Sequence, residues 1–268
     1  MTDDADTDDL RILPTRDGQV GYRIGGEGPL VLLIASTGRC CAELWPLAKA
    51  LQGHGFRVAR VEPRGILPSR GPMRDVSFHD FATDFVTVLS AELGEGERAI
   101  VAGHAYGTWV ARTVAADHPD IVAGVVLLAS GAKQWPQHLS AAITAINAAE
   151  TSDAERLAAL RLGFFAEGND AGEWLSGWHP EVVASQRAAR ALTPQSDWWE
   201  TGTAPILDLM GGADPFRPTG SEDELVREFA GRVTAEAIPN ASHAMPAEKP
   251  REAAATIARW WGGLKAGG

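Results

Sequence analysis

The stretch Ile100-Val101-Ala102-Gly103-His104-Ala105-Tyr106-Gly107-Thr108-Trp109 joins an apolar run to a helical pattern through a Gly-x-Ala-x-Gly sequence. The apolar residues enter the turn, and small and apolar residues at helical spacing leave it over residues 110–117. The flanking glycines allow a turn pressed so closely against its neighbours that a Cβ has no room. The stretch therefore predicts a strand, a sharp turn and a helix, with Ala105 at the apex.

The residue at this apex decides what chemistry the turn can perform. The same frame with Ser at its centre is the nucleophile elbow, which holds a hydroxyl above a sheet. Ala105 has no nucleophilic atom. Three explanations are open: an engineered Ser→Ala change that traps substrate, a natural alanine in an enzyme that works without a serine, and a natural pseudo-hydrolase that binds a ligand without turnover.

Apolar runs elsewhere in the chain alternate with helical patterns. The runs at residues 30–34, 57–61, 124–129, 205–210 and 232–238 read as strands, and several of them are apolar on both faces. Helical spacing follows them, for example over residues 42–54 and 248–261. This alternation predicts an α/β fold with a mostly parallel central sheet and helices on both faces.

The pattern changes between the apolar run at residues 124–129 and the run at residues 205–210. Strand signals disappear, Ala-rich helical segments appear, and five of the nine tryptophans gather there. We expect residues 131–203 to form a helical cap over a core made of residues 10–130 and 204–268. Residues 1–9 contain five aspartates and are expected to be an acidic, flexible tail.

Composition narrows the classes of partner and the compartment. The net charge of −11 argues against nucleic acid and anionic membranes, which bind basic surfaces. The acidic N-terminus has no signal-peptide pattern, no run is long enough to span a membrane, and Cys40 and Cys41 are adjacent. We expect a cytoplasmic monomer or homodimer that acts on a small-molecule substrate.

Two polar residues follow late strands of the predicted sheet, where open parallel sheets bind ligands. Asp214 directly follows Gly211-Gly212-Ala213, and His243 directly follows Pro239-Asn240-Ala241-Ser242. The chain also contains Glu62-x-Arg64-Gly65 after an earlier strand, and the elbow, the acid and the histidine follow one another in that order. In these motifs and in their order the chain resembles the α/β-hydrolase fold superfamily, from about residue 11 to residue 261. It is most similar to the cap-bearing esterase, lactonase and epoxide-hydrolase branch.

The resemblance implies a role for each site residue. Ala105 occupies the nucleophile position, His243 is the base, and Asp214 orients it. The backbone amides of Tyr106 and Thr37 would form the oxyanion hole. Ala35-Ser36 replaces the usual His-Gly of that loop, so the amide of Ser36 or Gly38 could serve instead.

The substrate pocket is expected beneath the cap. Trp135, Trp174, Trp178 and Ser36 are the predicted substrate contacts, and they indicate an apolar ligand. Trp109 is expected to pack near the elbow, and His104 behind it. No histidine forms a ligand pair such as HExxH, so we expect neither a metal nor a cofactor.

The sequence predicts an enzyme of the hydrolase type that acts on an ester or lactone of an apolar small molecule, without a serine nucleophile. A lyase or oxygenase that uses the His243–Asp214 pair for proton transfer is the alternative, and a ligand-binding pseudo-hydrolase is the third possibility.

Overall fold

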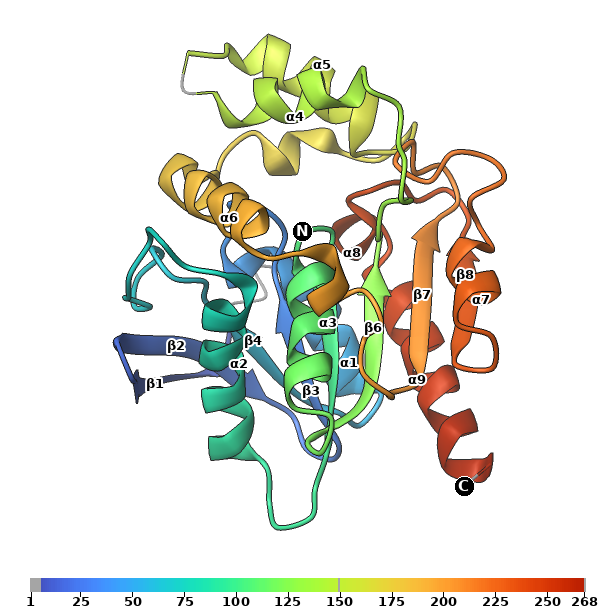
Figure 1. Ribbon diagram of the computed structural model, residues 1–268. Coiled ribbons are helices and arrows are strands. Elements are labelled where there is room, and N and C mark those ends of the chain that lie inside the picture. The colour runs from blue at the N-terminus through green and yellow to red at the C-terminus, as the bar shows by residue number, and fades with distance from the viewer. Residues whose placement is uncertain (1–5, 149, 268) are drawn as a thin grey trace.

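The computed structural model describes residues 6–148 and 150–267, and these residues form a central eight-stranded sheet (Figure 1). The strand order is β1-β2-β4-β3-β5-β6-β7-β8. The first three strands in this order pair antiparallel, and the remaining pairs are parallel. The predicted α/β class is confirmed. The strands are β1 (Asp9–Thr15), β2 (Gly18–Gly25), β3 (Leu30–Ile34), β4 (Arg57–Val61), β5 (Ala99–His104), β6 (Val122–Leu128), β7 (Ile206–Gly211) and β8 (Val233–Ile238).

Helices cover both faces of the sheet. On one face, α2 and α3 pack against Leu30, Leu32 and Ile34, and on the other α1 and α9 pack against Val31 and Leu33. Each residue of β3 is buried, as the continuous apolar run requires. The helices are α1 (Trp45–Gly53), α2 (Phe78–Glu92), α3 (Gly107–Asp117), α7 (Glu224–Glu228), α8 (Met245–Glu248) and α9 (Pro250–Gly267), and the short helix η1 (Cys41–Leu44) precedes α1.

The segment between β6 and β7 is helical and lies across the end of the sheet where the parallel strands finish (Figure 1). A capping box between Ser152 and Glu155 starts its second helix. Two backbone hydrogen bonds tie this cap to the loops below: His179 donates to Gly38, and Ala244 donates to Phe164. The cap elements are α4 (Leu139–Asn147), α5 (Asp153–Gly163), η2 (Ala171–Trp174), α6 (Pro180–Leu192) and η3 (Gln195–Asp197).

The acidic N-terminus corrects one expectation. Residues 1–5 of the predicted flexible tail lie outside the described residues, but residues 6–9 are held in place. The Arg60 guanidinium is fully buried and donates to Asp6 at 2.7 Å and to Asp8 at 2.9 Å. A buried cation needs paired acceptors, so these aspartates dock on the sheet and Asp9 begins β1. Within the described part of the chain, no helix is long and apolar enough to cross a membrane.

Candidate active site

The elbow adopts its predicted geometry without a hydroxyl at its apex. Ala105 has φ of 49°, in the left-handed region that non-glycine residues rarely occupy. Its amide donates to Leu128 on β6, and its carbonyl accepts from the hydroxyl of Thr108. A Cβ on Gly103 would lie 2.1 Å from the Gly107 carbonyl oxygen, and one on Gly107 would lie 2.6 Å from the Ile34 oxygen. Close packing therefore fixes this backbone, whichever small residue stands at 105.

Asp214 and His243 meet at the end of the sheet. The Nδ1 atom of His243 lies 2.9 Å from Oδ2 of Asp214, and the other carboxylate oxygen accepts from the Phe216 amide at 2.8 Å. Both side chains are largely buried. Since a carboxylate only accepts, Nδ1 donates the proton of this hydrogen bond, and in the neutral imidazole the lone pair is therefore on Nε2. The Phe216 ring lies 4.3 Å from the imidazole, centroid to centroid, and packs against it.

The loop after β3 leaves one amide for an oxyanion. The Ser36 amide donates to Glu43 at 2.8 Å, and the Gly38 amide donates to Gln186 of the cap at 2.9 Å. Within residues 6–148 and 150–267, the amides of Thr37 and Tyr106 have no hydrogen-bond partner. The structure therefore favours the Thr37 and Tyr106 pair and disfavours Ser36 and Gly38 as donors.

A buried polar cluster lies behind this loop and includes His104. Its Nδ1 atom lies 3.1 Å from Glu43, and its Nε2 lies 2.8 Å from the backbone oxygen of His243. Arg39 and the Ser36 hydroxyl donate to the second Glu43 oxygen. Burial alone would raise the pKa of Glu43, but these hydrogen bonds and neighbouring cations bring it below its ordinary value. The cluster joins the oxyanion loop, the elbow and the histidine loop.

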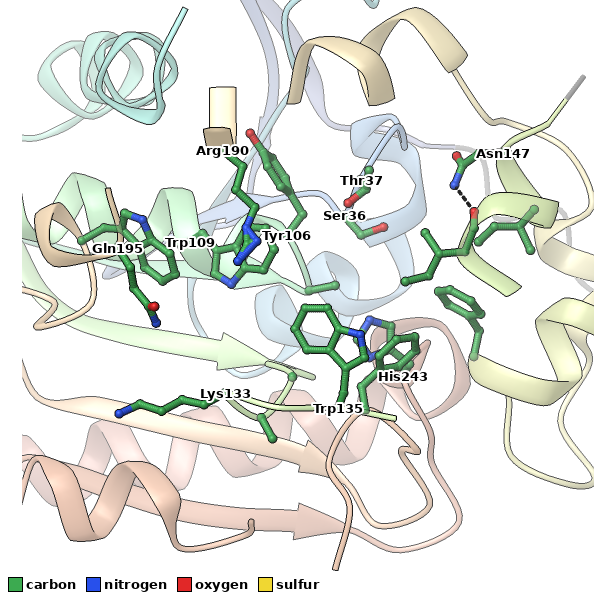
Figure 2. A pocket seen from close by; sticks show the side chains of 18 of the residues that line it. Ser36, Thr37, Tyr106, Trp109, Lys133, Trp135, Asn147, Arg190, Gln195 and His243 are labelled. Atoms are coloured by element: carbon green, nitrogen blue, oxygen red, sulfur yellow. Dashed lines mark hydrogen bonds between the residues drawn. The ribbon is translucent and has the colours of Figure 1, made fainter. Parts of the chain in front are cut away.

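A cavity of about 160 Å³ opens above the elbow, between core and cap (Figure 2). Ala105, Tyr106 and His243 lie in its wall together with Thr37, so the predicted groups share one space. The four predicted substrate contacts, Ser36, Trp135, Trp174 and Trp178, also line it. Asp214 lies behind His243 and outside the lining. Among the described residues, no group of three or more His, Cys, Asp or Glu side chains is placed to hold a metal ion.

Sequence reasoning missed several residues of the cavity wall. Trp109 packs on Tyr106 beside the elbow, as expected, but it also lines the cavity. Pattern alone gave no signal for most of the others, because they come from separate cap elements and loops. They are Lys133, Ile143, Ile146, Asn147, Phe164, Arg190, Gln195, Trp198, Trp199 and Phe216.

Comparisons with known proteins identify the family and the fold of this chain. The model of the alpha/beta hydrolase family matches residues 31–256. A hydrolase from Pseudomonas aeruginosa PA01 is similar in structure, with a TM-score of 0.74 at 22% identity over 96% of this chain and 100% of that one. A thermophilic esterase from Thermogutta terrifontis has a TM-score of 0.76 at 20% identity, over 94% and 98% of the two chains.

A third solved structure, Epoxide Hydrolase A from Mycobacterium thermoresistibile, has a TM-score of 0.67 at 19% identity, over 94% of this chain and 98% of that one. At such identities the likeness shows a shared fold. No curated protein sequence matches the chain.

Proposed function

This chain belongs to the alpha/beta hydrolase family, and we propose that it hydrolyses an ester or lactone of an apolar small molecule by activating water directly. One observation supports this proposal most. His243, which is hydrogen-bonded to Asp214, borders the same cavity as Thr37 and Tyr106. The amides of Thr37 and Tyr106 have no hydrogen-bond partner among the described residues, and Ala105 contributes only a methyl group at the apex. A base and an oxyanion hole are the groups that water attack on a carbonyl requires.

The reaction follows from the roles of these groups. Nε2 of His243 takes a proton from a water molecule as the water oxygen attacks the substrate carbonyl carbon. The carbonyl oxygen becomes an oxyanion, and the Thr37 and Tyr106 amides donate to it. Asp214 stabilises the imidazolium. As the tetrahedral intermediate collapses, the imidazolium returns the proton to the leaving alkoxide, which yields an acid and an alcohol without a covalent enzyme intermediate.

Without a serine at position 105, we expect a hydrolytic rate like that of hydrolases that have lost one member of the triad. Hydrolases that lose a triad member still accelerate reaction by about 10³- to 10⁴-fold over water, through binding and the oxyanion hole. We expect this chain to turn over at a comparable level or above it, because both His243 and Asp214 are in place.

A pair of proteins tests the proposal: the unmodified chain and Ala105→Ser, assayed on a panel of aryl esters and lactones. We expect slow turnover without a burst from the first, and from the second a burst and labelling by a serine-directed phosphonate. His243→Ala should abolish turnover in the Ala105 protein. Hydrolysis that survives His243→Ala, or two proteins that hydrolyse nothing, would refute the proposal.

Proton abstraction from a bound substrate is the second candidate. The observation that favours it is that, among the described residues, Nε2 of His243 has no hydrogen-bond partner and Ala105 offers it no hydroxyl, so the bound molecule itself can be the proton donor. The same two amides would then stabilise an enolate. Incorporation of solvent deuterium beside the carbonyl of a bound ketone, lost in His243→Ala, would support this chemistry over hydrolysis.

A further inference from the structure

One end of the cavity carries a cation without a counter-ion. Figure 2 shows Arg190, Trp109 and Gln195 grouped on one side of the cavity, with His243 and Asn147 on the other. The Cζ atom of Arg190 lies 4.5 Å from the centroid of the Trp109 ring, which holds the guanidinium against the wall.

The lining is positive overall. In the part of the chain that the structure describes, no Asp or Glu lines the cavity, and Arg190 makes no ion pair. Lys133, the other lining cation, is already paired with Glu228 at 2.7 Å and lies over the Trp199 ring. Arg190 is therefore the lining cation that is available to a ligand. A cationic end to a cavity is notable in a protein whose net charge is −11.

Two residues that line both the cavity and a surface hollow together with Arg190 also carry hydrogen-bond donors. Trp198 lines the same cavity and is 3% exposed, and its indole Nε1 has no partner among the described residues. The amide of Gln195 offers further donors. Arg190, Gln195 and Trp198 also line a surface hollow of about 360 Å³, so they border both this hollow and the cavity. A buried N–H without an acceptor favours a ligand that supplies one.

We propose that the cavity selects an anionic substrate, an ester of an apolar or aromatic molecule that also bears a carboxylate, and that Arg190 binds this carboxylate. The inference rests on the proposed function, because it places the ester at the Thr37 and Tyr106 amides and the carboxylate at Arg190. A guanidinium presents paired donors that match a carboxylate, whereas the tryptophan walls take the apolar body.

Equilibrium binding tests the inference without turnover. The probes are 4-phenylbutyrate and its neutral amide, 4-phenylbutyramide, and the signal is quenching of the lining tryptophans. Since hydrogen bonds to charged groups contribute roughly 10- to 100-fold in affinity, we expect the acid to bind at least about 10-fold more tightly than the amide. Arg190→Gln should remove this preference, and Arg190→Lys should keep part of it.

Arg187→Gln is the matched control. Arg187 lies on the same helix and lines the same surface hollow as Arg190, but it does not line the cavity, so the substitution removes the same charge without changing the cavity wall. We expect it to keep the preference for the acid. Equal binding of the two probes, a preference that survives Arg190→Gln, or an equal loss in Arg187→Gln would overturn the inference.

Catalysis supplies a second readout. The value of kcat/KM for mono-4-nitrophenyl adipate should exceed that for neutral 4-nitrophenyl hexanoate, and Arg190→Gln should lower this ratio about 10-fold. A protein that binds 4-phenylbutyrate selectively but hydrolyses no ester would retain the inference and refute the hydrolytic function. Hydrolysis with no preference for the anionic ester would retain the hydrolytic function and refute the inference.

Discussion

Replacing Glu43 with glutamine should destabilise the protein through the buried polar cluster behind the loop after β3. The Glu43 carboxylate accepts from the Ser36 amide at 2.8 Å, from Arg39 at 3.2 Å and from His104 at 3.1 Å. Glutamine offers one acceptor oxygen and turns an N–H₂ group toward donors. Both Arg39 and His104 are buried, so neither can recover its interaction from water.

The expected loss in free energy of unfolding depends on the contacts that Arg39 keeps in Glu43→Gln. Removing one partner of a buried ion pair costs about 3–5 kcal/mol. Arg39 keeps its bond to the Ser176 carbonyl and its contacts with the Trp174 and Trp178 rings, which places the expected cost near the lower limit. A loss of about 3 kcal/mol in a chain of this size lowers the melting temperature by about 6–12 °C.

Thermal unfolding followed by circular dichroism measures this difference. Glu95→Gln is the matched control, because Glu95 is exposed and makes no side-chain hydrogen bond within the described residues. It should change the free energy of unfolding by no more than about 0.5 kcal/mol. If Glu43→Gln cost less than about 1 kcal/mol, the cluster would not be the buried ionic network inferred here.

Four further predictions concern charge and protonation. Because folding lowers the pKa of Glu43, the ionised carboxylate stabilises the fold at neutral pH, and this stabilisation is lost as pH falls through the lowered pKa. The difference in free energy of unfolding between the unmodified protein and Glu43→Gln should therefore shrink when unfolding is measured at successively lower pH. Asp214→Asn should lower kcat about 10³- to 10⁴-fold with no comparable change in the dissociation constant of 4-phenylbutyrate, because it disturbs the His243 tautomer. Asp8→Asn should cost about 2 kcal/mol in thermal unfolding, since the buried Arg60 loses one of its two carboxylate partners and keeps Asp6 and the Trp45 ring. Burial raises the pKa of both tyrosines, that of Tyr22 to about 12. An alkaline absorbance titration should therefore show no phenolate near the ordinary tyrosine pKa while the protein stays folded. The free energy of unfolding should fall as pH rises above the ordinary tyrosine pKa, because the unfolded chain then loses these protons first.

The sequence was informative where a property is local. Continuous short apolar runs such as Leu30–Ile34, bounded by turn residues, favour strands buried on both faces, and the elbow glycines indicate a sharp turn whatever residue stands between them. Asp214 and His243 could be placed because the carboxyl ends of parallel strands meet at one edge.

The features that could not be predicted depend on partners far apart in the chain. The choice of Thr37 as donor rests on Glu43 and Gln186, and Gln186 reaches the loop from the cap. Arg60 lies more than fifty residues from the aspartates that bind it, which made the N-terminus read as an unattached acidic tail. Periodicity carries no information about such pairs.

The backbone of the elbow makes position 105 a natural site for enzyme engineering. Gly103 and Gly107 pack closely against backbone atoms, and these contacts do not involve the side chain at position 105. Ala105 already has the left-handed backbone conformation that a nucleophile would need. Serine, cysteine and aspartate could each be introduced there by one substitution on the same scaffold. Each would form a different covalent intermediate beneath the same tryptophan walls. A set of single-residue variants would thus compare the intrinsic reactivity of nucleophiles with the base, the oxyanion donors and the substrate pocket held constant.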